Sequence, residues 1–88
     1  MEEGEVNKKL VGEVTHYFGK ISVAVVKLSD SLSIGDKIFI EGATTKLEQE
    51  VKSMQIDKNP VEKAEAGQSI GLKVDDKVRE GDKVYKLE

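Results

Sequence analysis

The chain has 88 residues, of which 35% are charged, and its formal net charge is −3. This length excludes the larger catalytic folds, such as a dinucleotide-binding domain or a GTPase domain, because domains usually run to ~100–150 residues. Cysteine is absent and His16 is the single histidine, so disulfide frameworks and cysteine or multi-histidine metal sites are excluded too.

The charge balance differs from that of a typical nucleic-acid-binding protein, in which basic residues dominate. There are 17 acidic and 14 basic residues, and Arg79 is the only arginine. No apolar run approaches the ~18–20 residues of a membrane span, and residues 1–5 lack the charged and apolar regions of a signal peptide. We therefore expect a cytoplasmic protein with no membrane partner. The abundance of lysine and glutamate resembles the profile of heat-adapted proteins and predicts a thermostable chain.

The chain begins with a polar segment, residues 1–9, which predicts a flexible N-terminal arm. We expect a single domain over residues 10–88. A mixed apolar and polar run over residues 10–17 predicts its first strand. Gly19 permits a turn after that strand, because glycine readily adopts a positive φ.

A second strand is predicted over residues 21–28, which are rich in β-branched residues. Its pattern changes parity along the way. The positions expected to point inward are first Ile21, Val23 and Val25, and then Val26 and Leu28. Such a change predicts a bulge, of the kind a small barrel uses to turn its corners.

The segment 32–40 predicts a tight turn at Gly35-Asp36 and then a strand that points Ile38 and Ile40 to one side. The next segment, residues 44–56, is ambiguous. Its apolar residues fall at helical spacing and also alternate in part as in a strand, and the local pattern alone slightly favours a helix.

The last third of the chain predicts one helical turn and two strands. Asn59-Pro60 is typical of a helix start, so we expect a helical turn over residues 61–66 that Gly67 ends. A strand over residues 69–74 follows, and residues 78–87 form the final strand.

Two segments repeat one pattern. Residues 34–40 and 80–86 both contain Gly-Asp-Lys, then a β-branched residue and an aromatic one. Each predicts a glycine turn that leads into a strand. Two equivalent corners in a chain of short strands indicate a small all-β barrel or sandwich.

The order of the motifs resembles the second domain of translational GTPases such as elongation factor Tu, over residues 10–87. The segments that carry the resemblance are Val11-Gly12-Glu13-Val14, Gly19-Lys20, Leu32-Ser33-Ile34-Gly35-Asp36-Lys37-Ile38, Thr44-Thr45-Lys46, residues 64–72 and residues 78–84. The resemblance implies an all-β fold, a small closed six-stranded antiparallel barrel. It also implies that residues 44–56 form a strand with a bulge near Lys52-Ser53.

The resemblance further implies a non-catalytic binding module that contacts RNA, the ribosome or a translation-associated protein. The positions that match the family's binding residues are Lys20, Lys27, Ser53, Gln55 and Leu72. Family glycines are replaced here by Ile21 and Val26, and Gln55 stands where the family has glutamate. Similar barrels also occur as C-terminal appendages of some peptidases. The alternative function is therefore a protein-interaction barrel without RNA binding, related to the accessory barrels of other enzymes.

No residue pattern predicts catalysis. The phosphate-binding Gly-x-x-x-x-Gly-Lys-Ser/Thr motif is absent, so we expect neither a nucleotide nor another cofactor. The acidic residues Asp36, Asp75, Asp76 and Asp82 occupy turn positions, where aspartate ordinarily bonds to the nearby backbone. His16 has no serine or cysteine partner in a recognisable motif. We expect no catalytic residue, no metal site and no enzyme.

Overall fold

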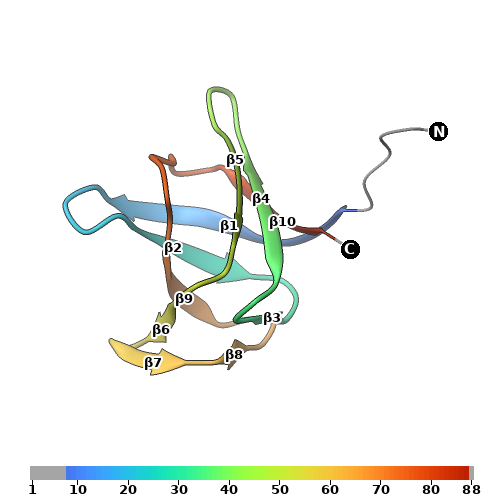
Figure 1. Cartoon of the computed structure of the whole chain (residues 1–88), viewed down its shortest axis with the longest axis vertical. Coiled ribbons are helices and arrows are strands. Elements are labelled where there is room, and N and C mark those ends of the chain that lie inside the picture. Colours follow the sequence, from blue (N-terminus) through green and yellow to red (C-terminus); the bar gives the residue numbers. More distant parts are fainter. Residues whose placement is uncertain (1–7, 88) are drawn as a thin grey trace.

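The computed structural model describes residues 8–87, which form an all-β fold of antiparallel strands (Figure 1). This confirms that the fold is all-β and antiparallel, as predicted. The strands are β1 (Lys8–Phe18), β2 (Val23–Leu28), β3 (Leu32–Ser33), β4 (Lys37–Glu41), β5 (Lys46–Glu50), β6 (Met54–Ile56), β7 (Asn59–Val61), β8 (Lys63–Ala64), β9 (Ser69–Lys73) and β10 (Lys83–Leu87).

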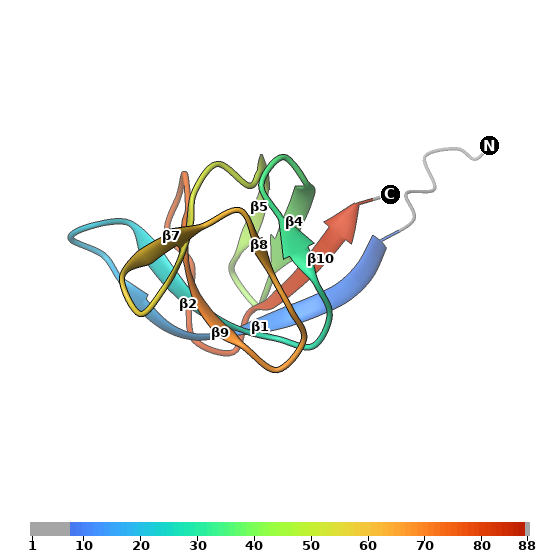
Figure 2. The same cartoon turned by 90° about the horizontal axis from the view of Figure 1, so that it is seen from below.

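One eight-stranded sheet has the order β5-β4-β10-β1-β2-β9-β6-β7, and β3 pairs with β8 in a separate two-stranded sheet. The large sheet curls around a common interior (Figure 2). Among the described residues its ladder has two ends, β5 and β7, so the hydrogen bonding differs from that of the expected six-stranded closed barrel.

The curl brings β5 close to the segment that follows β9. The Gln49 side chain on β5 is 7% exposed. Its Nε2 donates to the Lys73 carbonyl at 3.0 Å, and its Oε1 accepts from the Asp75 backbone N–H at 2.7 Å. A single side chain thus replaces backbone pairing where two distant strands of the sheet approach each other.

The core lies inside the curl and consists of small and medium aliphatic residues. Each is at most 2% exposed, and burial of such a side chain contributes roughly 1.5–3 kcal/mol. The buried apolar residues are Val11, Val14, Ala24, Val26, Leu28, Leu32, Ile38, Ile40, Val51, Met54, Ala64, Ile70, Leu72, Val74, Val78 and Val84. Ile38 and Ile40 point to one side, as the sequence predicted.

The two Gly-Asp corners are equivalent in detail, which confirms the repeat found in the sequence. Gly35 and Gly81 have φ values of 94° and 91°, a region that favours glycine. The Asp36 carboxylate accepts from the Ser33 N–H at 2.9 Å, and the Asp82 carboxylate accepts from the Arg79 N–H at 2.8 Å. The corners lead into β4 and β10, which pair directly with each other.

The bulge predicted in the second strand lies in its neighbour instead. β2 alternates regularly, with Ala24, Val26 and Leu28 buried and Val23 and Val25 on the outer face. The extra residue is in β1, where the register with β2 shifts between positions 14 and 16. The inward orientation expected for Val23 and Val25 was therefore wrong, because β2 carries apolar residues on both of its faces.

The middle of the chain contains strands where the local pattern slightly favoured a helix. β5 and β6 are separated at residues 51–53, which confirms the interruption that the resemblance implied near Lys52-Ser53. The helical turn expected over residues 61–66 is wrong, since β8 runs through this segment and pairs with β3. Pairing with a distant strand here outweighs the local helix-start signal.

The predicted N-terminal arm falls mostly outside the described residues. Lys8 and Lys9, which were assigned to the arm, lie in β1 and pair with Leu87 and Lys86 of β10. In residues 8–87 no helix has the length and apolar character needed to cross a membrane.

Candidate functional site

An apolar surface lies on the outside of the sheet where β1, β2, β9 and β6 run side by side. We call it the open face and define it by Phe18, Ile21, Val23, Val25, Gln55 and Gly71. Phe18 is 46% exposed and Ile21 is 57% exposed, which makes Ile21 the most exposed large hydrophobic residue described. Apolar side chains that gather on one surface in this way mark interaction sites more often than scattered ones do.

The open face is hollowed because a glycine stands at its centre. Gly71 on β9 pairs with Val25 of β2 on one side and with Gln55 of β6 on the other. A Cβ atom at position 71 would lie 3.3 Å from a Val23 methyl group. Gly71 lies among the residues that line a shallow hollow of ≈ 510 Å³, together with the aliphatic side chains of Val23 and Val25.

The hairpins β1–β2 and β6–β7 project on the same side of the molecule (Figures 1 and 2). Residues of both hairpins line the hollow, Phe18 and Ile21 from the first and Asp57 and Lys58 from the second. The tip of the β1–β2 hairpin is fixed to the end of β9. Ser22 has a positive φ of 57°, and its carbonyl accepts from the Val74 N–H at 2.9 Å. The Lys73 ammonium donates to the Ile21 carbonyl at 3.0 Å. The backbone that presents Ile21 to solvent is therefore held in place.

An aromatic pair borders the open face on β1. The rings of His16 and Phe18 meet edge to face with their centroids 4.4 Å apart. Nδ1 of His16 lies 3.0 Å from a Glu80 carboxylate oxygen. These contacts give His16 a structural role in orienting Phe18, and they place no nucleophile beside it.

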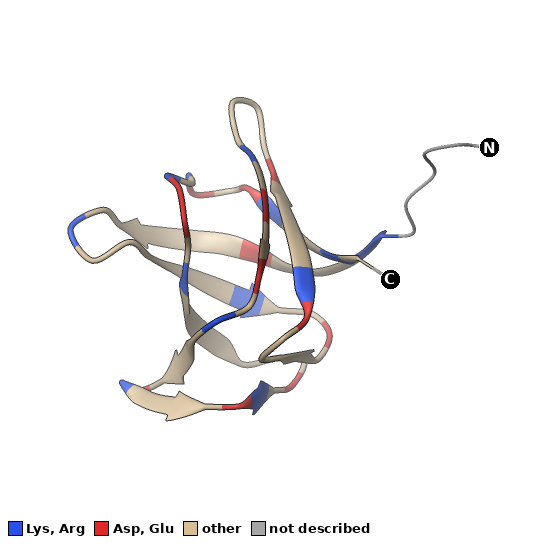
Figure 3. Ribbon diagram, viewed as in Figure 1, with Lys and Arg blue, Asp and Glu red and all other residues tan. Residues whose placement is uncertain are grey.

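Lysines surround the open face. Lys20 and Lys58 lie at the tips of the two flanking hairpins, where Figure 3 shows basic residues, and Lys73 lies at the end of β9. Asp57 is the one carboxylate among the described residues that line the hollow. The border of the surface is therefore more basic than the chain as a whole.

A second apolar patch, the covered face, lies on β4 and β10. Phe39 and Tyr85 are cross-strand neighbours there, and the Lys8 ammonium lies 5.1 Å and 4.7 Å from their ring centroids. Lys8 also pairs with Glu41 at 3.2 Å, and Lys83 pairs with Glu13 at 3.2 Å. Here the Lys8 ammonium covers both aromatic rings and is neutralised by Glu41.

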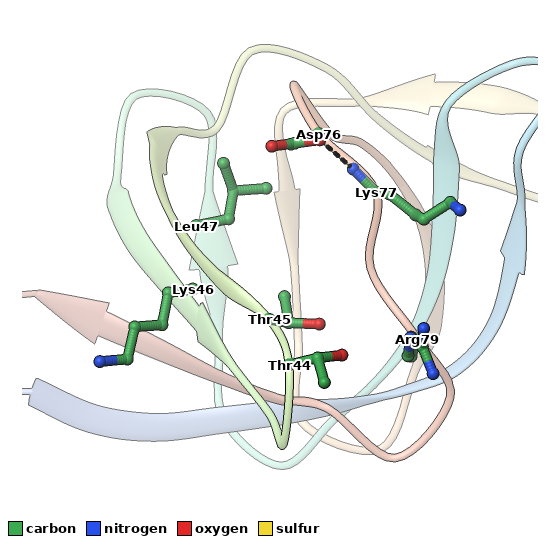
Figure 4. A pocket seen from close by; sticks show the side chains of 7 residues that line it. All are labelled: Thr44, Thr45, Lys46, Leu47, Asp76, Lys77 and Arg79. Carbon is green, nitrogen blue, oxygen red and sulfur yellow. Dashed lines mark hydrogen bonds between the residues drawn. The ribbon is translucent and has the colours of Figure 1, made fainter.

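A cleft of ≈ 300 Å³ lies between the β4–β5 hairpin and residues 76–79 (Figure 4). Thr44 and Thr45 face the side on which Arg79 lies, whereas Lys46 points away. The Asp76 carboxylate accepts from the backbone N–H of Lys77 at 2.7 Å. Three cations, Lys46, Lys77 and Arg79, and one carboxylate, Asp76, line the cleft, and Leu47 is its one large apolar residue.

The residues predicted as a binding site separate in the structure. Ser53 and Gln55 are exposed beside the hollow, and Lys20 stands at its border. Lys27 is exposed but lies opposite Glu13, at the far end of β2. Leu72 is 0% exposed and belongs to the core, so it offers nothing to a partner from the open face.

Most of the open face was missed in the sequence. Ile21, Val23 and Val25 were expected to point to the interior, and no binding role was predicted for Phe18 or Gly71. The available signal was the run of apolar residues over 23–26, which gives β2 two apolar faces. The structure shows that only one of these faces is covered by the core.

The described residues include no group of three or more His, Asp or Glu side chains that could hold a metal ion. The aspartates at the Gly-Asp corners bond to their own turns, as predicted.

No family model matches the chain. Among curated proteins, it is 47% identical over 78 residues to the uncharacterized protease MJ0090 of Methanocaldococcus jannaschii, which covers 88% of this chain and 19% of that protein. It is 40% identical over 83 residues to a collagenase of Porphyromonas gingivalis, which covers 92% of this chain and 23% of that protein. The chain thus spans about a fifth of the length of the curated relatives it matches.

Among solved structures, the fold matches the C-terminal domain of a Geobacillus thermoleovorans protein assigned to the U32 peptidases. The TM-score is 0.85 at 18% sequence identity, covering 91% of this chain and 93% of that chain. A selenomethionine variant of the same domain gives a TM-score of 0.82. The relatives found are proteases and collagenases, so the proposed kinship with translation factors was wrong.

Proposed function

We propose that this chain is a non-catalytic accessory domain of a protease-like protein and that it binds a polypeptide through the open face. The observation that carries the proposal is the uncovered, hollowed apolar surface formed by Phe18, Ile21, Val23, Val25 and Gly71. The relatives support the accessory role, because a match of about a fifth of their length leaves room for a separate catalytic part.

Physical reasoning favours a binding role for this surface. A shallow hollow on a sheet cannot exclude water from a reaction, whereas aliphatic side chains on a rigid sheet suit a flat contact with another chain. The held tip of the β1–β2 hairpin reduces the ordering cost of such a contact, because less conformational freedom is lost on binding.

The proposal is tested by capture from a native extract with three versions of the chain: the wild type, Ile21→Glu and Ile34→Glu. Ile34 is a matched control, since it is also an exposed aliphatic residue, 40% exposed, outside the open face. We expect the wild type and the Ile34→Glu variant to retain the same identified protein and the Ile21→Glu variant to lose it.

Treatment with RNase distinguishes a direct polypeptide contact from capture that depends on RNA. Retention of the protein after RNase supports a direct polypeptide contact. Loss of all capture after RNase, or equal capture by all three versions, would overturn the proposal.

The non-catalytic part of the proposal has its own test. The purified chain is incubated with a gelatin substrate and with unstructured fluorogenic peptides, and we expect no hydrolysis above buffer. Turnover that rises in proportion to the amount of the chain, and that persists across independent preparations, would contradict this part.

We also propose that the curled sheet is a closed six-stranded barrel, in which Gln49 joins the two edges that lack backbone pairing. The support is the Gln49 side chain, whose amide spans the gap between β5 and the segment after β9. Gln49→Leu removes both bonds and leaves two backbone groups unpaired, so we expect a loss of about 2–4 kcal/mol in urea unfolding. A loss below about 1 kcal/mol would contradict closure through this residue.

A further inference from the structure

We infer that the open face selects an acidic polypeptide segment in which one aliphatic side chain lies between carboxylates. This inference rests on the proposed function and names the class of partner that the surface fits. The aliphatic side chain occupies the hollow over Gly71, and the carboxylates meet the lysines at its border.

Two of the three lysines near the open face, Lys20 and Lys58, are available for such a partner. Within residues 8–87, Lys20 and Lys58 have no carboxylate within ion-pair distance, and the Lys73 ammonium donates to a backbone carbonyl. On the covered face, by contrast, Lys8 and Lys83 are each paired with a glutamate at 3.2 Å. Carboxylates of a partner can therefore complement these unpaired charges.

The chemistry of the hollow favours an aliphatic side chain of the partner. Its floor combines the Gly71 backbone with the side chains of Val23 and Val25, and Phe18 and Ile21 form one side. Binding of an aliphatic group to this floor is favourable because it removes apolar surface of both molecules from water. A branched aliphatic residue such as leucine suits this space, while a charged residue would lose its hydration there.

A polypeptide fits this surface better than a nucleic acid. RNA-binding sheets stack bases on several aromatic rings and commonly use arginine. The open face has one exposed phenylalanine, and the only arginine of the chain, Arg79, lines the cleft at the β4–β5 hairpin instead. The open face has lysines around an aliphatic centre, and a partner segment with carboxylates on both sides of an aliphatic residue is complementary to it.

The experiment follows amide signals of the isotope-labelled 88-residue chain by NMR during titration with short synthetic peptides. One peptide has leucine flanked by glutamates, a second has leucine flanked by lysines, and a third has serine flanked by glutamates. We expect the first peptide to shift amides of β2 and β9 and to bind at least about tenfold more tightly than the other two. Raising the salt from about 0.05 to about 0.5 M should weaken it severalfold.

Matched variants localise the effect. Lys20→Glu/Lys58→Glu should weaken binding about tenfold, whereas Lys46→Glu/Lys77→Glu, with the same change in net charge away from the open face, should leave it unchanged within about twofold. Gly71→Val fills the hollow with a residue that strands favour and should abolish binding. Ile21→Glu provides a second blocking variant that leaves the core intact.

The outcomes are distinguishable. If the glutamate and lysine peptides bind the open face equally, the acidic preference is overturned while the docking surface stands. If a single-stranded RNA oligonucleotide shifts the same amides and displaces the first peptide, a nucleic acid is the partner and the inference fails. If the peptides bind elsewhere, the assignment to the open face fails as well.

Discussion

The covered face and the open face belong to one sheet, and they differ in how far their apolar side chains are shielded from solvent. On the covered face, Phe39 and Tyr85 lie under the Lys8 ammonium, which Glu41 neutralises. On the open face, Phe18 and Ile21 are 46% and 57% exposed and have no such cover. The difference shows that this small chain can shield apolar surface with its own charges, and that it leaves one area unshielded.

The contrast also separates residues that stabilise the fold from residues that are free to contact a partner. Covering a ring with a paired lysine contributes modestly to stability at an exposed site. An uncovered aliphatic residue at 57% exposure contributes little to folding and keeps most of its surface for a partner. The two faces therefore predict different consequences for similar substitutions.

The largest expected effect lies directly beneath the open face. Leu72→Ala removes a side chain that is 0% exposed, so we expect a loss of about 2–5 kcal/mol in urea unfolding. Under conditions where both proteins are folded, binding through the open face should change little. A loss below about 1 kcal/mol would place Leu72 on the surface rather than in the core, and Leu10→Ala serves as the exposed control.

The next effect concerns the corners that lead into the strands of the covered face. Asp82 is 4% exposed, and the side chain of Asp36 is 22% exposed. Asp82→Ala should cost about 2 kcal/mol and Asp36→Ala about 1 kcal/mol, because each leaves a backbone N–H without its carboxylate and burial increases the cost. Thermal unfolding of both variants checks the order, and a larger loss from Asp36→Ala than from Asp82→Ala would contradict the role assigned to burial.

A smaller effect is expected from removing the Lys8 side chain that covers the two rings of the covered face. Lys8→Ala uncovers Phe39 and Tyr85 and removes the pair with Glu41, so we expect a loss of about 0.5–1 kcal/mol that shrinks at high salt. The control is Lys58→Ala beside the open face, which should leave stability unchanged. Equal losses from both variants would remove the distinction between the faces.

Stability should hardly respond to substitution on the open face. Phe18→Ser and Ile21→Ser are each expected to change the free energy of unfolding by less than about 0.5 kcal/mol, since surface substitutions rarely exceed this. Denaturant melts measure it directly. A loss above about 1 kcal/mol would mean that these side chains serve the fold rather than a partner.

The smallest effect concerns an ion pair outside both faces. The hydrogen bond from Lys9, at 2.6 Å, is the largest of the causes that hold the pKa of Asp30 below its ordinary value of 3.8. A lowered folded-state pKa stabilises the fold above that ordinary value, and the contribution is lost as the pH falls through the folded-state value. Lys9→Ala should raise the pKa of Asp30 in a carboxyl NMR titration, and an unchanged pKa would contradict the role of Lys9.

Much of the fold could be predicted from the sequence because turn chemistry is local. Gly35-Asp36 and Gly81-Asp82 identified two equivalent corners, and alternation identified the inward side of β4. Residues 61–66 could not be predicted, because the partner of β8 is β3, which is distant in the sequence.

The candidate site was harder to predict for a related reason. A strand with apolar residues on both faces does not reveal which face meets the core, and the register shift in β1 that settles it depends on pairing. Gln55 and Ser53 were found through resemblance, and Gly71 was not, because a glycine without a positive φ gives no local signal.

The most direct test of the central claim is site-specific photo-crosslinking. A photoreactive amino acid is placed at position 25, on the open face, and in a second protein at position 39, on the covered face. After RNase treatment of a native extract, we predict a discrete polypeptide adduct from position 25 and none from position 39. Adducts of equal yield from both positions, or an adduct from position 39 alone, would contradict the account.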